Sequence, residues 1–205
     1  ALIIWNFTKN KKQTIAGLFH DISTPVFKHC IDFMNGDHET QESTEELTTY
    51  MIKNSKEIME LLERDNIKVD EVDDYHIYPI ADNDTPKLSA DRLEYTFTNG
   101  LYFKEVWNVQ KIKEIYSNIE IQINEDNIQE LGFKDKNIAE EFIVGASQLW
   151  PLWVSNEDKL AMQFLADTVK KMSEENLLTK KDLYSLSEKE VINKMINVYK
   201  DKEDV

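Results

Sequence analysis

Residues 16–32 read Ala16-Gly17-Leu18-Phe19-His20-Asp21-Ile22-Ser23-Thr24-Pro25-Val26-Phe27-Lys28-His29-Cys30-Ile31-Asp32. An apolar segment ends in the adjacent pair His20 and Asp21, and a proline turn leads to a second helix start that carries His29 and Asp32. An imidazole beside a carboxylate suits a metal site, because both donate lone pairs and the carboxylate offsets the charge of the cation. Such a pair also occurs as a satisfied polar contact in a core or on a surface, so the dipeptide alone leaves both interpretations open.

The stretch resembles the signature segment of the HD-domain metal-dependent phosphohydrolases, in which apolar residues, His-Asp-Ile, a Pro and Phe, and then a His follow one another. Within that superfamily, Phe27-Lys28-His29-Cys30-Ile31-Asp32 followed by His38-Glu39 is similar to the deoxynucleoside triphosphate triphosphohydrolase branch. Farther on, Ser89-Ala90-Asp91-Arg92-Leu93-Glu94-Tyr95 resembles the segment that supplies the last aspartate ligand of the family. The three segments occur in the order of the family.

The resemblance implies an all-α HD-domain helical bundle that holds one divalent metal ion, whether Mn, Fe, Ni, Zn or Mg. It assigns His20, Asp21 and Asp91 as metal ligands, and a metal-activated water as the attacking group in phosphate hydrolysis. In the family, a first histidine ligand lies on the preceding helix, and no histidine precedes His20 here. We expect that the first helix is truncated and that this ligand lies upstream of residue 1. The alternative is an incomplete site.

The resemblance also implies that His29 and His38 contact phosphate or transfer a proton, and that Asp32 orients an imidazole. Many members of the branch carry Gly and then His or Asn where this chain has Ser23-Thr24, and no basic nucleotide-recognition segment stands out. The expected substrate is therefore a nucleotide, with a deoxynucleoside triphosphate as one candidate, or another small phosphorylated compound. Arg92 either binds phosphate or forms a structural ion pair.

Two alternatives to the enzyme remain open. The first is a catalytically silent HD domain that binds a nucleotide or a protein partner as a regulator. The second is a plain helical interaction domain in which the His-Asp pair is structural. Metal binding would distinguish the plain interaction domain from the enzyme and the silent HD domain. Hydrolysis would distinguish the enzyme from the silent HD domain.

Charge and cysteine content exclude several classes of protein. The chain has 24 Lys and Arg against 39 Asp and Glu, a formal charge of −15 that would repel a nucleic-acid partner. The single cysteine, Cys30, excludes an internal disulfide and is interpreted as a small buried apolar residue. No membrane-spanning run or signal peptide is recognised, so we expect a cytoplasmic protein without a membrane partner.

Five glycines and four prolines in 205 residues favour helices with few tight turns. Apolar spacing predicts helices at 1–7, 13–21, 26–33, 44–64, 106–116, 137–153 and 156–172, one around Asp91 that ends at Asn99-Gly100, and two within 177–199. Period-two alternation predicts a short strand over residues 119–123, within a β-hairpin or extended arm around 117–133. Residues 75–79 are expected to be extended.

We expect an HD-type helical domain over residues 1–172 and a C-terminal helical extension over residues 173–205. Trp150 and Trp153 are interpreted as core residues, and any aromatics exposed around them would suit a helix-mediated dimer, so a homo-oligomer stays open. His76 is expected to be a packing or surface histidine, and the acidic run 70–74 a solvated face without a metal role.

Overall fold

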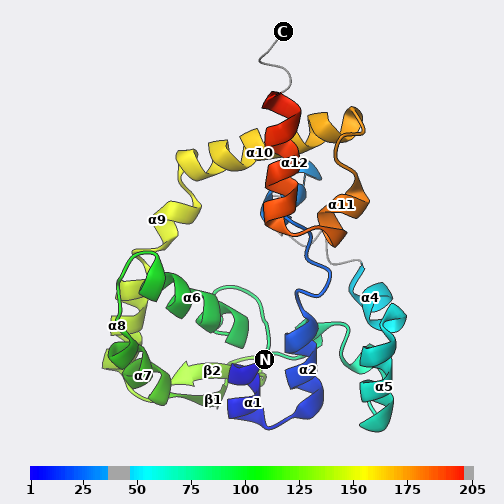
Figure 1. Cartoon of the computed structure of the whole chain (residues 1–205). Helices are drawn as coiled ribbons and strands as arrows, with labels where there is room; N and C mark the ends of the chain where they lie inside the picture. The colour runs from blue at the N-terminus through cyan, green and yellow to red at the C-terminus, as the bar shows by residue number, and fades with distance from the viewer. Residues whose placement is uncertain (37–46, 201–205) are drawn as a thin grey trace. The chain divides into compact units, whose positions relative to one another are not determined.

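The computed structural model describes residues 1–36 and 47–200, which form a mainly helical structure with one two-stranded antiparallel sheet (Figure 1). This confirms the predicted mainly helical class. The chain divides into two compact units, the first made of Ala1–His20 and Ile52–Val154 and the second of Asp21–Met51 and Ser155–Val205. The chain therefore passes from one unit to the other between His20 and Asp21, within α4 (Thr48–Asn54), and between Val154 and Ser155.

The remaining elements belong to one unit or the other. The first unit contains α1 (Leu2–Thr8), α2 (Lys11–Phe19), α5 (Lys56–Arg64), the 3₁₀ turns Val69–Glu71 and Tyr75–Ile77, α6 (Ala90–Tyr102), α7 (Val109–Ser117), β1 (Ile119–Ile123), β2 (Gln129–Phe133), α8 (Lys136–Ala146) and α9 (Trp150–Trp153). The second contains α3 (Lys28–Met34), α10 (Asn156–Glu174), α11 (Lys180–Ser185) and α12 (Glu188–Lys200).

An aromatic cluster forms the centre of the first core. The ring of Trp107 stacks on Phe142 with centroids 5.6 Å apart, and Phe97 meets both rings edge-on. Two glycines make room for Trp107, since a Cβ added at Gly100 or Gly145 would lie 2.5 or 2.2 Å from its ring. Gly100 is thus an interior position of α6, required by close approach, and the predicted helix stop at that residue is wrong.

The β-hairpin is confirmed. β1 pairs with β2 in antiparallel register, with Ile119 opposite Phe133 and Ile121 opposite Leu131. Ile119 and Leu131 are buried in the aromatic core, which explains the period-two pattern of β1. Asn127 adopts a positive φ of 59° in the connecting turn.

Three predicted elements differ from the structure, and in two of them a side-chain cap overrides the sequence pattern. The predicted helix 44–64 is interrupted at Ser55, whose Oγ accepts a hydrogen bond from Ile58 N–H and starts α5. The predicted helix 137–153 ends at Ala146, and Pro151 lies in the first turn of the separate α9. Residues 75–77 form a 3₁₀ turn, not an extended piece, capped by Asp74.

The second unit has its own apolar core between α3 and α10–α12. Its buried residues are Ile31, Val169, Met172, Leu178, Leu183 and Val191. The predicted boundary at residue 172 lies inside this core, since residues on both sides of it pack together. Cys30 is buried in this unit as predicted, and burial raises the pKa of its thiol.

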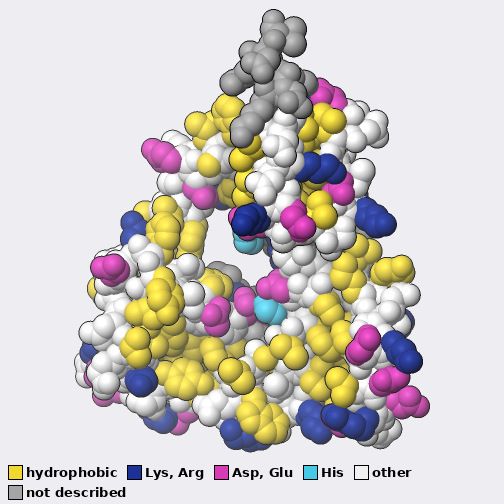
Figure 2. All heavy atoms as spheres, in the orientation of Figure 1, with side chains coloured by type: hydrophobic (Ala, Val, Ile, Leu, Met, Phe, Trp, Pro, Cys, Tyr) yellow, Lys and Arg dark blue, Asp and Glu magenta, His cyan; other side chains and the backbone are white. Residues whose placement is uncertain are grey.

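Hydrophobic side chains are exposed along α8 and α9 (Figure 2), among them Ile143, Val144 and Trp150. Trp150 is 50% exposed, so its predicted core role is wrong. Trp153 packs edge-on against Tyr95, with centroids 5.6 Å apart. None of the described helices combines the length and apolar character that a membrane crossing requires.

The close approach of Trp107 to α8 can be tested at Gly145. Alanine is the better helix former by about 1 kcal/mol, so Gly145→Ala would stabilise an uncrowded helix. Because the new Cβ would meet the Trp107 ring, we expect Gly145→Ala to lower the free energy of unfolding by about 1–3 kcal/mol in urea denaturation. The exposed Val144→Ala is the control. In a double variant that combines Gly145→Ala with Trp107→Leu, the loss of unfolding free energy should be smaller than the sum of the losses in the two single variants.

Asp182 at the start of α11 predicts a pH dependence of stability. Hydrogen bonds from the backbone and hydroxyl of Thr179, with Lys194 2.9 Å away, lower the pKa of Asp182 from 3.8 to about 2. A carboxyl with a lowered folded-state pKa stabilises above its unfolded pKa, and this contribution is lost as the pH falls through the folded value. The difference in unfolding free energy between wild type and Asp182→Asn should therefore be constant above pH 5 and shrink towards pH 2. Thr179→Ser keeps the hydroxyl that donates to Asp182, so its unfolding free energy should depend on pH in the same way as that of the wild type.

Candidate functional site

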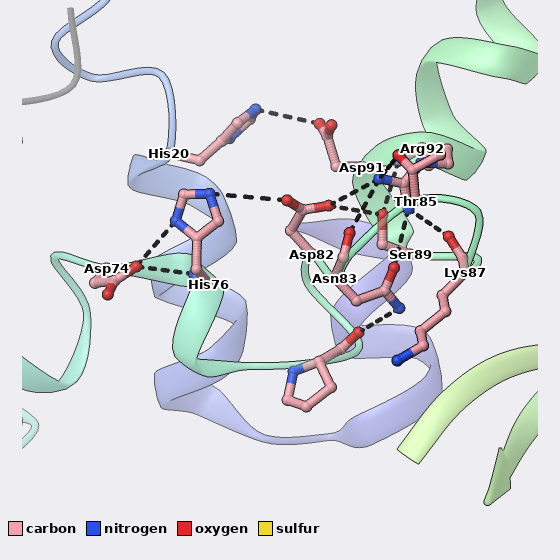
Figure 3. A network of polar contacts seen from close by, with 11 residues as sticks. His20, Asp74, His76, Asp82, Asn83, Thr85, Lys87, Ser89, Asp91 and Arg92 are labelled. Carbon is pink, nitrogen blue, oxygen red and sulfur yellow. Dashed lines mark hydrogen bonds and ion pairs between the residues drawn. The ribbon is translucent and has the colours of Figure 1, made fainter. Parts of the chain in front are cut away.

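Two of the predicted metal ligands meet in the first unit. His20 caps the C-terminus of α2, and Asp91 lies in the first turn of α6. The Nε2 atom of His20 is 3.5 Å from Oδ1 of Asp91 (Figure 3), and the two side chains are 30% and 37% exposed. The fold therefore joins two residues that the sequence separates widely, at a place that a ligand can reach.

The orientation of His20 is fixed by its other ring nitrogen. Nδ1 lies 3.1 Å from the carbonyl oxygen of Gly17, and a carbonyl only accepts, so Nδ1 carries the hydrogen. In the neutral ring, Nε2 then presents a lone pair towards the carboxylate of Asp91. Two electron-rich atoms in this geometry are stabilised by a cation or proton between them, and a histidine anchored through its second nitrogen is typical of metal ligands.

Asp91 is fixed by the hydrogen bonds that start α6. Ser89 caps the helix by accepting a hydrogen bond from Arg92 N–H at 3.1 Å. The backbone N–H groups of Ala90 and Asp91 donate to the carbonyls of Ile80 and Ala81, at 2.8 and 3.2 Å. The first turn of α6 is thus fastened to the preceding segment.

The side chain of Arg92 holds that preceding segment together. Its guanidinium donates to Oδ1 and the carbonyl of Asn83, at 2.9 and 3.0 Å, and to the carbonyl of Lys87. Asn83 in turn donates to the carbonyls of Pro79 and Leu88. We call residues 79–89 with Arg92 the arginine clamp. Of the two roles left open by the sequence, this geometry supports a structural one for Arg92, because its donors are engaged within the clamp.

A second His-Asp pair lies beside the first and was missed by sequence reasoning. Nδ1 of His76 is 3.1 Å from Oδ1 of Asp74, and Nε2 is 3.8 Å from Oδ2 of Asp82 (Figure 3). Oδ1 of Asp82 accepts a hydrogen bond from the Ser89 hydroxyl at 3.0 Å. The pattern Asp74-x-His76 was a local signal for a capped turn, but residues 76 and 82 share no regular spacing that would have revealed their pairing.

The other predicted site residues belong to the second unit or lie outside the described residues. Asp21 accepts a hydrogen bond from the Thr24 hydroxyl at 2.9 Å. On α3, His29 is exposed and Asp32 is fully buried. His38 lies outside the described residues. The roles of these four residues stay predictions.

Within residues 1–36 and 47–200, no group of three or more His, Cys, Asp or Glu is arranged to hold a metal ion. In the first unit, His20 and Asp91 together supply one nitrogen and one oxygen donor, fewer than the three donors of such a group. A groove of about 330 Å³ lies elsewhere in this unit, lined by Trp107, Lys111 and Glu141 among others, and contains none of the candidate residues. We therefore assign this groove no role in the candidate site.

Comparisons of the chain with protein-family models, curated proteins and solved structures found no match.

Because of the arginine clamp, we expect a substitution at Arg92 to lower the free energy of unfolding far more than the same substitution at Arg64, the other arginine of the chain. Arg92→Lys keeps the charge but loses the planar set of donors, so we expect the free energy of unfolding to fall by about 2–4 kcal/mol. Arg64 pairs with its neighbour Asp65 on the surface, so Arg64→Lys should have little effect. Urea denaturation of both variants measures the difference. Equal effects would contradict a clamp.

Proposed function

We propose that this protein is a metal-dependent phosphohydrolase that acts on a nucleotide or another small phosphorylated compound. The observation that carries the proposal is the pair formed by His20 and Asp91, with 3.5 Å between Nε2 and Oδ1 and with Nδ1 of His20 anchored on Gly17. The resemblance to HD-domain phosphohydrolases had assigned both as metal ligands. It also assigns Asp21, which belongs to the second unit and stays a prediction.

The donor set suits a divalent transition metal, since imidazole nitrogen and carboxylate oxygen together match borderline cations. When bound, such an ion polarises a phosphoryl oxygen and lowers the pKa of a bound water. His20 offers its Nε2 lone pair in an orientation fixed by Gly17, and Asp91 contributes a negative charge from a helix start that the clamp holds in place. The chain's own contribution is a pre-oriented pair of ligands.

Substrate binding has to overcome the acidity of the protein. The formal charge is −15, and Arg92 is engaged within the clamp. Lys87 lies 3.2 Å from Asp126 and forms an ion pair there. A cation at the His20–Asp91 pair would offset the local negative charge for a phosphate group. The roles that the resemblance assigns to His29, His38 and Asp32 stay predictions and are not part of this argument.

The proposal is tested by metal content, measured by elemental analysis of the full-length protein after loading with Mn, Fe, Ni, Zn or Mg. We expect about one ion per chain in the wild type. His20→Ala and Asp91→Ala should each weaken binding at least about tenfold, because each removes a ligand. Asp126→Asn, which removes an exposed carboxylate of the hairpin turn, is the control and should retain the ion.

Hydrolysis is then measured as phosphate or polyphosphate release from deoxynucleoside triphosphates, nucleoside monophosphates and simple phosphate esters. Activity should disappear with a chelator, return with metal, and be absent in Asp91→Ala. A protein that binds metal through His20 and Asp91 but hydrolyses none of these would favour the regulatory alternative. The absence of stoichiometric metal under all loading conditions would contradict the proposal.

A further inference from the structure

The pair formed by His76 and Asp82 is not used by the proposed metal site. Both ring nitrogens of His76 face carboxylate oxygens, Nδ1 that of Asp74 at 3.1 Å and Nε2 that of Asp82 at 3.8 Å. A doubly protonated imidazole satisfies this arrangement, because both of its nitrogens are then donors. The contact with Asp82 is an ion pair, longer than a direct hydrogen bond.

Two connections place this pair next to the His20–Asp91 pair. The ring of Tyr75 lies against both histidines, with centroids 5.3 Å from His20 and 4.2 Å from His76. On the other side, Ala81 accepts the backbone hydrogen bond of Asp91, and Asp82 is the next residue. Figure 3 shows the two histidines facing the two aspartates.

In the second pair, Asp82 is held in place by its neighbours, and His76 is accessible. Asp82 is held by the Ser89 hydroxyl and lies 3.8 Å from the guanidinium of Arg92. The side chain of His76 is 41% exposed, whereas that of Asp82 is 18% exposed. Histidine and acidic side chains reach the surface of this unit (Figure 2). The ring can thus meet a ligand while its carboxylate partner stays fixed.

We propose that His76, oriented by Asp74 and Asp82, is a catalytic residue that contacts the leaving-group oxygen of the substrate and protonates it. The inference rests on the proposed phosphohydrolase function and adds a residue that the resemblance does not assign. Imidazole suits the role because its ring nitrogens can both donate and take up a proton.

The step balances as hydrolysis. The oxygen of water forms the new bond to phosphorus, and the bond from phosphorus to the leaving oxygen breaks with its electron pair on that oxygen. The leaving oxygen takes the proton from Nε2 of His76. The attacking water releases a proton to solvent, and the ring regains one from solvent, so that ester and water give alcohol and phosphate.

The test compares wild type and His76→Gln, both loaded with metal, on two esters of the same phosphate class. In one the leaving group is an alcohol, as in thymidine 5′-phosphate, and in the other it is 4-nitrophenol, which leaves without a proton. We expect kcat to fall by about 10²- to 10⁴-fold on the alkyl ester and by less than about tenfold on the nitrophenyl ester. The metal content of His76→Gln should equal that of wild type.

Two further variants separate this role from a structural one. Asp74→Asn weakens the contact to Nδ1 and should lower kcat on the alkyl ester more than on the nitrophenyl ester, in the same sense as His76→Gln. Glu140→Gln removes an exposed carboxylate from α8, outside the clamp and the candidate site, and should leave both activities unchanged.

Each outcome has one meaning. Equal losses of kcat on both esters, or no loss on either, would overturn the role of His76. The proposed function would still stand in that case, provided that the metal-loaded wild type is active. Loss of metal in His76→Gln would also overturn it, because the residue would then support the metal site. A wild type that binds metal but hydrolyses neither ester nor any nucleotide would overturn both.

Discussion

The hydrogen bonds of the Arg92 guanidinium are the interaction on which the candidate site depends. They gather the carbonyls of Asn83 and Lys87 and the side chain of Asn83 around one planar cation. Irregular backbone of this kind offers few ladder hydrogen bonds, so its carbonyls need other donors. By supplying them from α6 itself, Arg92 ties the segment to the helix that carries Asp91. The same segment delivers Asp82, and the two aspartates are therefore fixed by one clamp.

The histidine side of the site depends on a glycine. A Cβ at Gly17 would lie 2.1 Å from Cδ1 of Ile4, so the absence of a side chain lets α1 approach α2 closely. The carbonyl of the same residue accepts the hydrogen of Nδ1 and sets the ring of His20. Close helix packing and the orientation of the His20 ring thus arise at one position. The site joins a packed helix pair to a clamped helix start, and this would orient His20 and Asp91 in advance for the metal that we propose.

The features predicted correctly from sequence are those encoded locally. The strand over residues 119–123, the helix that becomes α10 and the burial of Cys30 follow from spacing and composition. The break at Ser55 depends on a cap that competes with a continuous apolar stripe, and the continuation of α6 through Gly100 depends on Trp107. Within the site, the meeting of His20 and Asp91 was predicted only through the resemblance. The pairing of His76 with Asp82 is tertiary, set by the clamp, and no spacing encodes it.

The charge of the candidate site argues for the chemistry proposed. Asp74, Asp82 and Asp91 place three carboxylates around two imidazoles, and the Arg92 guanidinium lies 3.8 Å from Asp82. Of the lysines nearby, Lys12 pairs with Glu71 and Lys87 with Asp126. A phosphate brought to this surface would meet net negative charge, since each carboxylate repels it. Under the proposed function, a divalent cation between His20 and Asp91 would offset these carboxylates and make phosphate binding favourable. The acidity of the site is therefore the reason why the proposed phosphohydrolase would need its metal in order to bind phosphate.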